Sequence, residues 1–281
     1  MKQRKRGIRR MFAGAMAAFM VLSAVDVSGW GVMNAKAEET AVGTNPQYLT
    51  IGSTKIIDNG IFQNNEVSGN DTIYQGTNWY YDSTKNQLVL DGADGASVSD
   101  DILNIDGNLA IILSGTNTMR MIQSGLHNGQ IEQTLEINGS NYNGSLSCGT
   151  ISTIRRKSTN SNLNIIGATL ETSKIDCEGS VTIENSHVVA NDTDNPDLIC
   201  GDNINIVDSY VEVKATTERH EDEVIKSNQQ INVSGSQIVV SRALACQKPV
   251  LSDCNFSNSV ITKQWKDYET KDNVTKTYVY G

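Results

Sequence analysis

A one-residue slip in the alternation of apolar residues constrains the fold of this chain more than any other feature. In the stretch INIVDSYVEV, Ile204 and Ile206 occupy even positions, whereas Val211 and Val213 occupy odd positions. Side chains of a β-strand alternate between its two faces, so a continuous strand would expose one of these pairs to water. The stretch therefore predicts two short strands that meet at a bend, formed by the Asp-Ser pair between them.

The same pattern recurs along the chain. With Ile204 numbered zero, apolar residues fall at 0, +2, +7 and +9, and further copies begin at Leu109, Leu135, Leu163, Val181, Ile231 and Cys254. Position +4 is Gly, Asn or Asp in every copy but the first, which has Leu113 there, and position +5 is always Ser or Ala. Gly, Asn and Asp accept the left-handed backbone conformation at little cost, as a tight corner requires.

A third strand is expected before each zero position. Inward residues are predicted six and four positions earlier, at Leu103 and Ile105, Ile175 and Cys177, Leu198 and Cys200, and Ile225 and Ser227. Three short strands in a repeat of about 24 residues predict an all-β fold, a right-handed parallel β-helix. The alternative, a β-sandwich, would show hairpin signals between its strands and no corner residue at a fixed position.

The chain divides into five predicted parts. Residues 1–37 have a basic start, an apolar run at 11–25 and a small-x-small cleavage site, which together predict a secretory signal peptide. The alternative, a membrane anchor, needs about 20 apolar residues. The remaining parts are a linker (38–47), a β-rich N-terminal cap (48–98), the parallel β-helix (99–264) and a C-terminal cap or tail (265–281). We expect a secreted or surface-associated monomer without a membrane span after cleavage.

The charge of the chain excludes one class of partner. The leader holds seven of the 23 basic residues and one of the 32 acidic ones, so the mature chain carries 16 against 31, a net charge near −15. A surface of this sign repels the phosphate backbone, so nucleic acid is not an expected partner. Divalent cations and neutral polymers suit it better.

Several motifs carry a resemblance to a known family. They are the runs YLTIGSTKIIDNG, NWYYDSTKNQLVLDGA, ILNIDGNLAIILSGTNTM and VIKSNQQINVSGSQIVV. Over most of residues 48–262 the sequence resembles the exported carbohydrate-binding β-helix proteins of clostridia and related gut Firmicutes. The resemblance implies a pectate-lyase-like right-handed β-helix, bound calcium and affinity for plant polysaccharides without established catalysis.

The repeat also predicts which side chains face outward. Position +6 holds Thr169, His187, Tyr210, Gln237 and Val260, and position +8 holds Glu171, Val189, Glu212, Val239 and Thr262. Such a ladder could bind polysaccharide, with Tyr210 as a stacking surface and His187, Glu171, Glu212 and Gln237 as hydrogen-bonding groups. Trp79 in the cap is a second candidate platform. The alternatives are a merely solvated outer face and an apolar cap role for Trp79.

Acidic residues collect in two loops that follow neighbouring coils. Asp197 lies in the first loop, and Asp222 and Glu223 lie in the second. Adjacent coils are about 4.8 Å apart, so these carboxylates could form the oxygen-rich cluster that calcium prefers. The alternative is an ordinary acidic surface loop.

No catalytic residues are predicted. A polysaccharide lyase would need charge neutralisation and a base, and Arg219, His220 and Lys226 beside the acidic loop are the available basic groups. No second basic residue is placed opposite them, so binding without catalysis is the favoured function. A lyase and a structural or adhesive surface protein stay as alternatives.

The five cysteines are an odd number for an exported protein. Cys177 and Cys200 are predicted to occupy the same inward position on neighbouring coils, either as a disulfide or as buried thiols. Cys246 and Cys254 could bridge a short loop, and Cys148 has no evident partner.

Overall fold

A computed structural model describes the chain between residues 46 and 280. The described ranges are 46–63, 73–76, 78–94, 101–125, 133–141, 143–154, 161–192, 199–215, 223–240, 243–246, 248–252, 259–266 and 273–280. The predicted signal peptide lies outside them, as does all of the linker except its last two residues. Within these ranges, the chain contains no helix of the length and apolarity that crossing a membrane requires.

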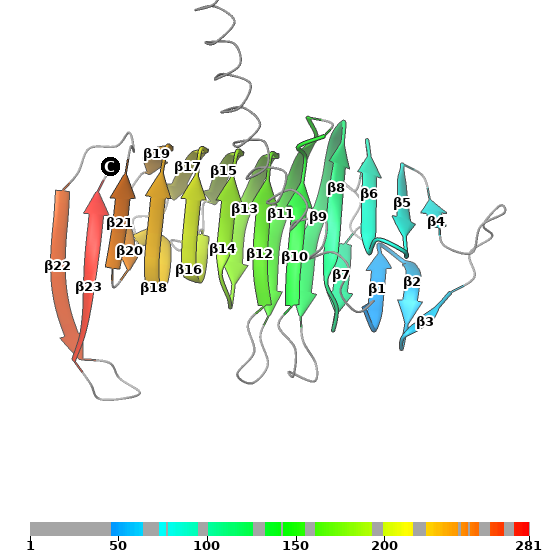
Figure 1. The fold of residues 1–281 in the computed structure, drawn as a ribbon, viewed down its shortest axis with the longest axis horizontal. Helices are drawn as coiled ribbons and strands as arrows, with labels where there is room; N and C mark the ends of the chain where they lie inside the picture. The colour runs from blue at the N-terminus through cyan, green and yellow to red at the C-terminus, as the bar shows by residue number, and fades with distance from the viewer. Residues whose placement is uncertain are drawn as a thin grey trace, which may run out of the picture. The chain divides into compact units, whose positions relative to one another are not determined.

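Parallel strands of successive coils lie side by side (Figure 1). Their pairings fall on three faces of the coil, called here the first, second and third sheets. The first sheet contains β6 (Gln87–Asp91), β8 (Leu109–Ser114), β10 (Gln133–Asn138), β12 (Ser161–Ile166), β14 (Val181–Glu184), the second halves of β16 (Ile199–Val207) and β18 (Glu223–Ser234), and β21 (Lys248–Ser252). Each strand pairs in parallel with the strand of the next coil. The predicted parallel β-helix is therefore confirmed.

The chain leaves the first sheet at a corner and enters the second. The second sheet contains the first halves of β9 (Thr116–Gly125), β11 (Ser145–Ile154) and β13 (Thr169–Cys177), followed by β15 (His187–Asp192), β17 (Tyr210–Ala215) and β19 (Gln237–Val240). The third sheet contains β7 (Asp101–Ile105), the remaining halves of β9, β11, β13, β16 and β18, and β20 (Ala243–Cys246). The chain then returns to the first sheet.

The two pairs of apolar residues that flank the slip all point inward. Ile204, Ile206, Val211 and Val213 are each 0% exposed. Equivalent residues stack above and below them, because the register keeps each zero position beside the next. Burial of one such side chain is worth about 1.5–3 kcal/mol before the entropy cost. Because of the one-residue slip, the apolar side chains of both strands point into the same buried core.

The bend between the two strands has the predicted left-handed backbone. Gly167, Asn185, Asp208 and Gly235 have φ values of 57°, 48°, 47° and 58°. The N–H of each donates a hydrogen bond to a carbonyl of the next coil, as Asp208 does to the Ser234 carbonyl at 3.0 Å. The backbone N–H of each of these corner residues therefore has its acceptor in the next coil.

Two earlier corners differ from the predicted frame. Leu113 and Gly139 occupy position +4, but the left-handed residues are Gly115 and Asn143. The register shows one extra residue in the first of these corners and four in the second. Inserted residues shift the frame of the second strand, so its inward residues are not those that the simple repeat predicts.

The predicted inward residues of the third sheet are correct in some coils and wrong in others. Ile175 and Cys177 point inward, as do Ile225 and Ser227. In β7 the buried residues are Ile102 and Asn104, and Leu103 faces outward. In β16 they are Ile199 and Gly201, and Cys200 faces outward, whereas the predicted Leu198 lies outside the described residues. The turn from the third sheet to the first varies in length. Counting back a fixed number of residues from position zero therefore does not predict which residues of the preceding strand point inward.

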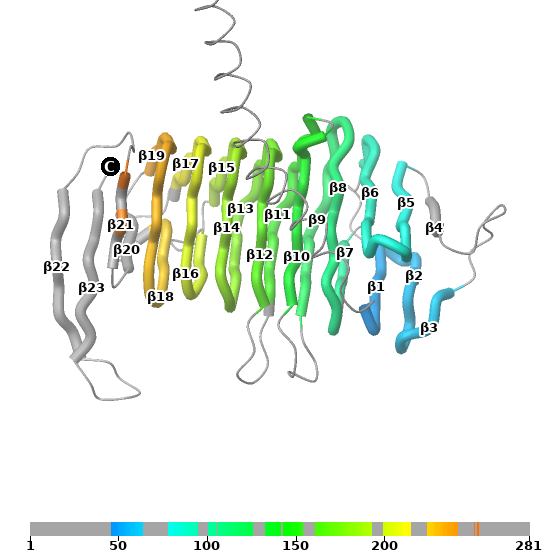
Figure 2. Tube along the Cα trace, in the orientation of Figure 1, coloured from blue at the N-terminus to red at the C-terminus, as the bar shows by residue number. Residues whose placement is uncertain are grey.

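The N-terminal cap is β-rich, as predicted, and consists of two antiparallel additions to the stack (Figure 2). β1 (Tyr48–Ile51), β2 (Thr54–Asp58) and β3 (Ile61–Phe62) extend the third sheet, because β1 pairs with β7. β5 (Trp79–Asp82) extends the first sheet by pairing with β6, and β4 (Ile73–Gly76) pairs with β5. Two edges of the first coil are thus covered.

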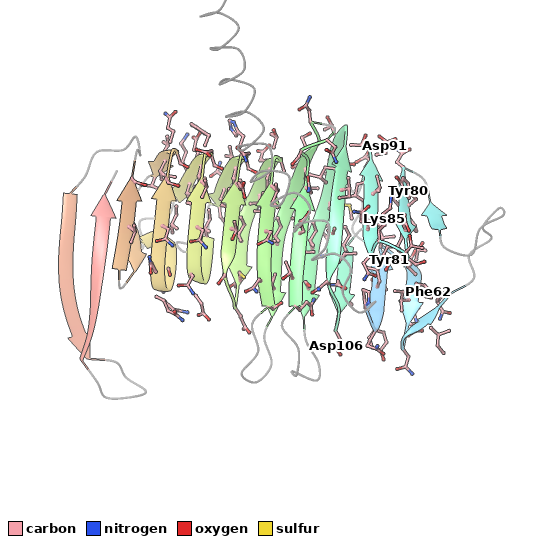
Figure 3. The ribbon with its side chains drawn as sticks, viewed as in Figure 1. Phe62, Tyr80, Tyr81, Lys85, Asp91 and Asp106 are labelled. Carbon is pink, nitrogen blue, oxygen red and sulfur yellow. The ribbon has the colours of Figure 1, made fainter. Side chains whose placement is uncertain are left out.

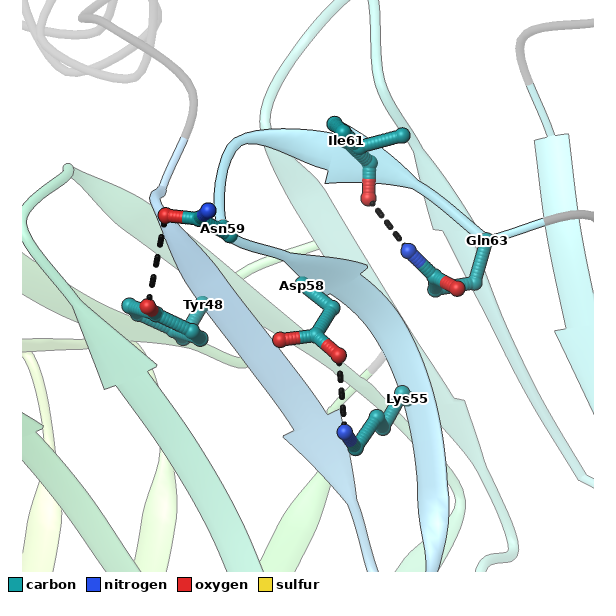
Figure 4. Close-up of polar contacts among 6 residues, drawn as sticks. All are labelled: Tyr48, Lys55, Asp58, Asn59, Ile61 and Gln63. Carbon is teal, nitrogen blue, oxygen red and sulfur yellow. Dashed lines mark hydrogen bonds and ion pairs between the residues drawn. The ribbon is translucent and has the colours of Figure 1, made fainter.

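Polar contacts hold the turns of this cap. Tyr81 is fully buried, and its hydroxyl donates to Asn86 Oδ1 at 2.8 Å (Figure 3). Within β2, Lys55 Nζ lies 2.7 Å from Asp58 Oδ2 (Figure 4). The cap therefore contains one buried hydrogen bond at the β5–β6 turn and one surface ion pair in β2.

The C-terminal end of the stack corrects one predicted copy of the repeat. Pro249 and Leu251 of β21 pair with Ile231 and Val233, so the last described strand of the first sheet begins at residue 248 rather than at Cys254. β22 (Ser259–Lys266) and β23 (Asn273–Tyr280) form an antiparallel hairpin, and β23 pairs with β20 of the third sheet. The copy predicted at Cys254 is wrong because β22 is antiparallel to its neighbour.

Candidate functional site

The outer face of the second sheet brings most of the predicted polysaccharide-binding residues together. Thr169, His187, Tyr210 and Gln237 are aligned in successive strands. A second column, two residues further along each strand, contains Glu171, Val189, Glu212 and Val239. Both predicted columns therefore exist in β13, β15, β17 and β19. Val260 and Thr262 lie in the antiparallel β22 and do not continue them.

Tyr210 is the centre of a connected polar cluster on this face. Its ring centroid lies 4.5 Å from that of His187, with 36° between the ring planes. Its hydroxyl donates a hydrogen bond to Glu212 Oε2 at 2.8 Å. Glu212 also forms an ion pair with Lys214. Three of these side chains come from β17 and the fourth from the neighbouring strand β15.

Lys214 is a member of this cluster that the sequence reasoning missed. Tyr210, Glu212 and Lys214 are spaced by two residues in one strand, so their side chains point to the same face. That spacing is visible in the sequence. The repeat frame ended at position +9, one residue before Lys214, and so did not include it.

The cluster stabilises the ordinary charge states of its members. The ammonium of Lys214 and the hydroxyl of Tyr210 both donate to Glu212 and lower the pKa of its carboxyl group. The same hydrogen bonds raise the pKa of Tyr210 and of Lys214. At neutral pH Glu212, Lys214 and Tyr210 are therefore a carboxylate, an ammonium and a neutral phenol.

The stacking of His187 on Tyr210 limits how a ligand can approach. One face of the tyrosine ring lies against the imidazole, and Gln237 is aligned beside Tyr210 in the next strand, so at most one ring face remains for a ligand. Glu171 and His187 are exposed and lie in the two preceding coils. The face is therefore better suited to hydrogen bonding than to broad ring stacking.

Trp79 lies apart from this cluster. It belongs to β5 in the N-terminal cap, is half-buried and packs against the apolar core. It pairs across the hairpin with the fully buried Leu90. These contacts match the apolar cap role.

The predicted calcium ligands fall mostly outside the described residues. Asp197 and Asp222 lie beyond them, and of Glu223 only the backbone is described, as the first residue of β18. Arg219 and His220 are also outside. Among the residues that the structure does describe, no group of three or more His, Cys, Asp or Glu side chains could hold a metal ion.

The register excludes a disulfide between Cys177 and Cys200. Cys177 is inward and buried, whereas Cys200 pairs with Asp176, whose side chain faces the opposite side of the sheet. Cys148 and Cys177 are free, buried thiols. Thr153 donates to the Cys177 sulfur at 3.0 Å. The Cys246–Cys254 pairing stays a prediction, because Cys254 lies outside the described residues.

Comparison with known proteins does not extend these observations. The sequence matches no protein-family model, no curated protein and no solved structure. The function has to be argued from the side chains that the coils align on their outer faces.

Proposed function

We propose that this chain is an exported, non-catalytic β-helix protein that binds polysaccharide along the outer face of its second sheet. The observation that carries the proposal is the alignment of Thr169, His187, Tyr210 and Gln237 in successive parallel strands. Such strands repeat at about 4.7–4.9 Å. A polymer laid along the stack therefore meets an equivalent backbone environment in every coil.

The side chains of this face have the donors and acceptors that sugar hydroxyl groups require. Glu171 and Glu212 accept hydrogen bonds, Lys214 donates them, and Gln237 does both. Hydrogen bonds to charged groups are stronger than those between neutral groups. Tyr210 adds a partly exposed aromatic ring between His187 and Gln237. Together these groups support binding of a hydroxylated chain without a reaction.

Export and calcium belong to the same proposal. The basic, apolar and small-residue pattern of residues 1–37 supports export. Asp197, Asp222 and Glu223 are the residues proposed to bind calcium, which prefers carboxylate oxygens. Calcium would stabilise the loops beside the third sheet and has no assigned part in contacting the glycan. The resemblance to exported carbohydrate-binding β-helix proteins supports each of these points.

Binding of the purified protein to a panel of soluble and insoluble glycans tests the proposal. Tyr210→Ala and Glu212→Gln should each weaken binding of the selected glycan about tenfold, which corresponds to about 1.4 kcal/mol. Gln123→Ala, on the outer face of the third sheet, is the matched control and should bind as the unaltered protein does. Unchanged binding by both second-sheet variants would exclude this face, and a panel without any bound glycan would exclude the function.

A further inference from the structure

The outer face of the first sheet carries an uncharged ladder of amide and hydroxyl groups. Asn164, Thr182, Asn205 and Asn232 are aligned in β12, β14, β16 and β18. All four side chains are half-buried on the outside of the sheet. The neighbouring column adds the aligned pair Asn203 and Gln230. The ladder spans four successive coils.

Two of these amides are already ordered along the stack. Asn232 Nδ2 donates to Asn205 Oδ1 at 2.6 Å, and Gln230 Nε2 donates to Asn232 Oδ1. Each amide in such a row keeps one N–H and one oxygen lone pair for a further partner. A ligand that binds here meets side chains whose rotamers are fixed beforehand, so little rotamer entropy is lost on binding.

The other half of the ladder has unused hydrogen-bonding capacity. In the described part of the chain, the side chains of Asn164 and Thr182 have no hydrogen-bond partner. Both are half-buried, so they are partly screened from water without being satisfied by the protein. A ligand group placed against them would restore these hydrogen bonds.

The ladder differs in charge from the second-sheet columns. The ladder from Asn164 to Asn232 contains no ionisable group, and the acidic residues near it are Glu136, one coil before its start in the same column, and Glu184, in the next column beside Thr182. Burial raises the pKa of the Glu136 carboxyl group, which also accepts from Asn138 Nδ2 at 2.9 Å. The second sheet, in contrast, presents Glu171, Glu212 and Lys214. The chain as a whole is acidic, with a net charge of −9.

The geometry points to the first-sheet ladder, Asn164, Thr182, Asn205 and Asn232, as a binding surface for a neutral, hydroxyl-rich polymer that lies along the stack. A neutral polymer is favoured because amides and hydroxyls exchange hydrogen bonds with both the donor and the acceptor of a sugar hydroxyl. A polyanion would be repelled by the acidic chain and would find no cation on this ladder. The inference rests on the proposed function for the class of polymer, but assigns it a second face and a preference in charge.

Affinity electrophoresis with a soluble neutral glucan and with polygalacturonate tests this surface. The double substitution Asn205→Ala and Asn232→Ala should reduce glucan affinity at least tenfold, and the unaltered protein should bind glucan more tightly than polygalacturonate. Thr182→Val removes only a hydroxyl group and keeps a β-branched residue in the strand, so it serves as a second variant if the double variant does not fold. Gln123→Ala on the third sheet is again the control.

The outcomes separate this inference from the proposed function. Loss of glucan binding in the amide and Thr182 variants supports the ladder. Unaltered glucan binding in both, together with loss in Tyr210→Ala, overturns the ladder and leaves the second-sheet face standing. Unaltered binding in all variants overturns both faces, and tighter binding of polygalacturonate overturns the preference for a neutral polymer.

Discussion

Left-handed residues at the corners explain why one position of the repeat accepts only three residue types. Asn185 and Asp208 adopt this conformation with a side chain, at φ values of 48° and 47°. Gly167 has an additional constraint, because a Cβ there would collide with Ser140 of the preceding coil. The choice among Gly, Asn and Asp at a given corner therefore depends on what the neighbouring coil places against it.

Substitution of Gly167 by Ala should lower the free energy of unfolding by at least 1–2 kcal/mol, roughly the cost of a left-handed alanine. The collision with Ser140 adds to this cost. Asn185→Gly is the matched control: it removes a side chain from the same type of corner and should change stability by less than about 1 kcal/mol. Urea denaturation measures both, and equal losses in the two variants would contradict the explanation.

The buried cysteines make a second prediction at this scale. Burial raises the pKa of Cys148 to about 12 and also raises that of Cys177. The unfolded thiols ionise near 9, so this contribution to stability is present below pH 9 and is lost as the pH rises toward 12. In alkylation at pH 8, Cys148 and Cys177 should react only after denaturation, as mapped by mass spectrometry. Rapid labelling of Cys148 in the folded protein would contradict its burial.

At the scale of the elements, serine side chains connect the corners of successive coils. Ser186, Ser209 and Ser236 occupy position +5 and are nearly buried. The N–H of Ser186 donates to Ser209 Oγ at 3.1 Å, and the N–H of Ser209 donates to Ser236 Oγ at 3.1 Å. Each hydroxyl in turn donates to a carbonyl of its own coil, as Ser209 does to Val207 at 2.6 Å. The small residue at +5 is therefore also a hydrogen-bonding link between coils.

Removal of one link should destabilise the stack. Ser209→Ala leaves the buried N–H of Ser186 without its acceptor, which costs about 1–3 kcal/mol. Ser234→Ala, on the outer face of the first sheet beside the same corner, should cost less than about 0.5 kcal/mol. Thermal unfolding followed by circular dichroism compares the two variants. A melting temperature of Ser209→Ala equal to that of Ser234→Ala would show that the ladder adds no stability.

The elements differ in how far the sequence predicts them. The strands on both sides of the Asp208 corner could be predicted because a corner of constant length preserves the phase. The third sheet could not be predicted reliably, since the turn from Ile199 to Ile204 is shorter than the turn from Ile225 to Ile231. The two columns of the candidate site could be predicted because they lie in strands that follow a corner of constant length. Cys200 is separated from position zero by a turn of variable length, and its predicted inward orientation was wrong.

At the scale of the whole stack, the structure keeps polar groups inside as well as outside. Asn104, Ser124 and Gln133 are buried and connected, because both amides donate to the Ser124 hydroxyl. Within the described chain, Asn104 Oδ1, Gln133 Oε1 and Ser161 Oγ lack hydrogen-bond partners. Buried groups of this kind are usually satisfied by internal water, which makes about three hydrogen bonds.

The ends of the stack are protected in different ways. The N-terminal end adds antiparallel strands to the first and third sheets, and the C-terminal hairpin covers β20 of the third sheet. The last described strand of the first sheet, β21, contains Pro249. Proline has no N–H to offer to a further strand and is typical of edge strands. These features limit pairing of the first and third sheets with a second chain.

Calcium binding, if the carboxylates of Asp197, Asp222 and Glu223 form the proposed site, should be measurable as stability of the whole molecule. A ligand at 100 times its dissociation constant adds about 2.7 kcal/mol. For a domain of this size 1 kcal/mol shifts the melting temperature by about 2–4 °C, so calcium in excess should raise it by about 5–10 °C over EDTA. Magnesium should have a smaller effect, because it prefers a rigid octahedral site. Asp222→Asn should reduce the rise in melting temperature caused by calcium without changing the melting temperature in EDTA. Equal melting temperatures of the unaltered protein in calcium and in EDTA would exclude the calcium site. That result would not bear on the proposed glycan-binding faces.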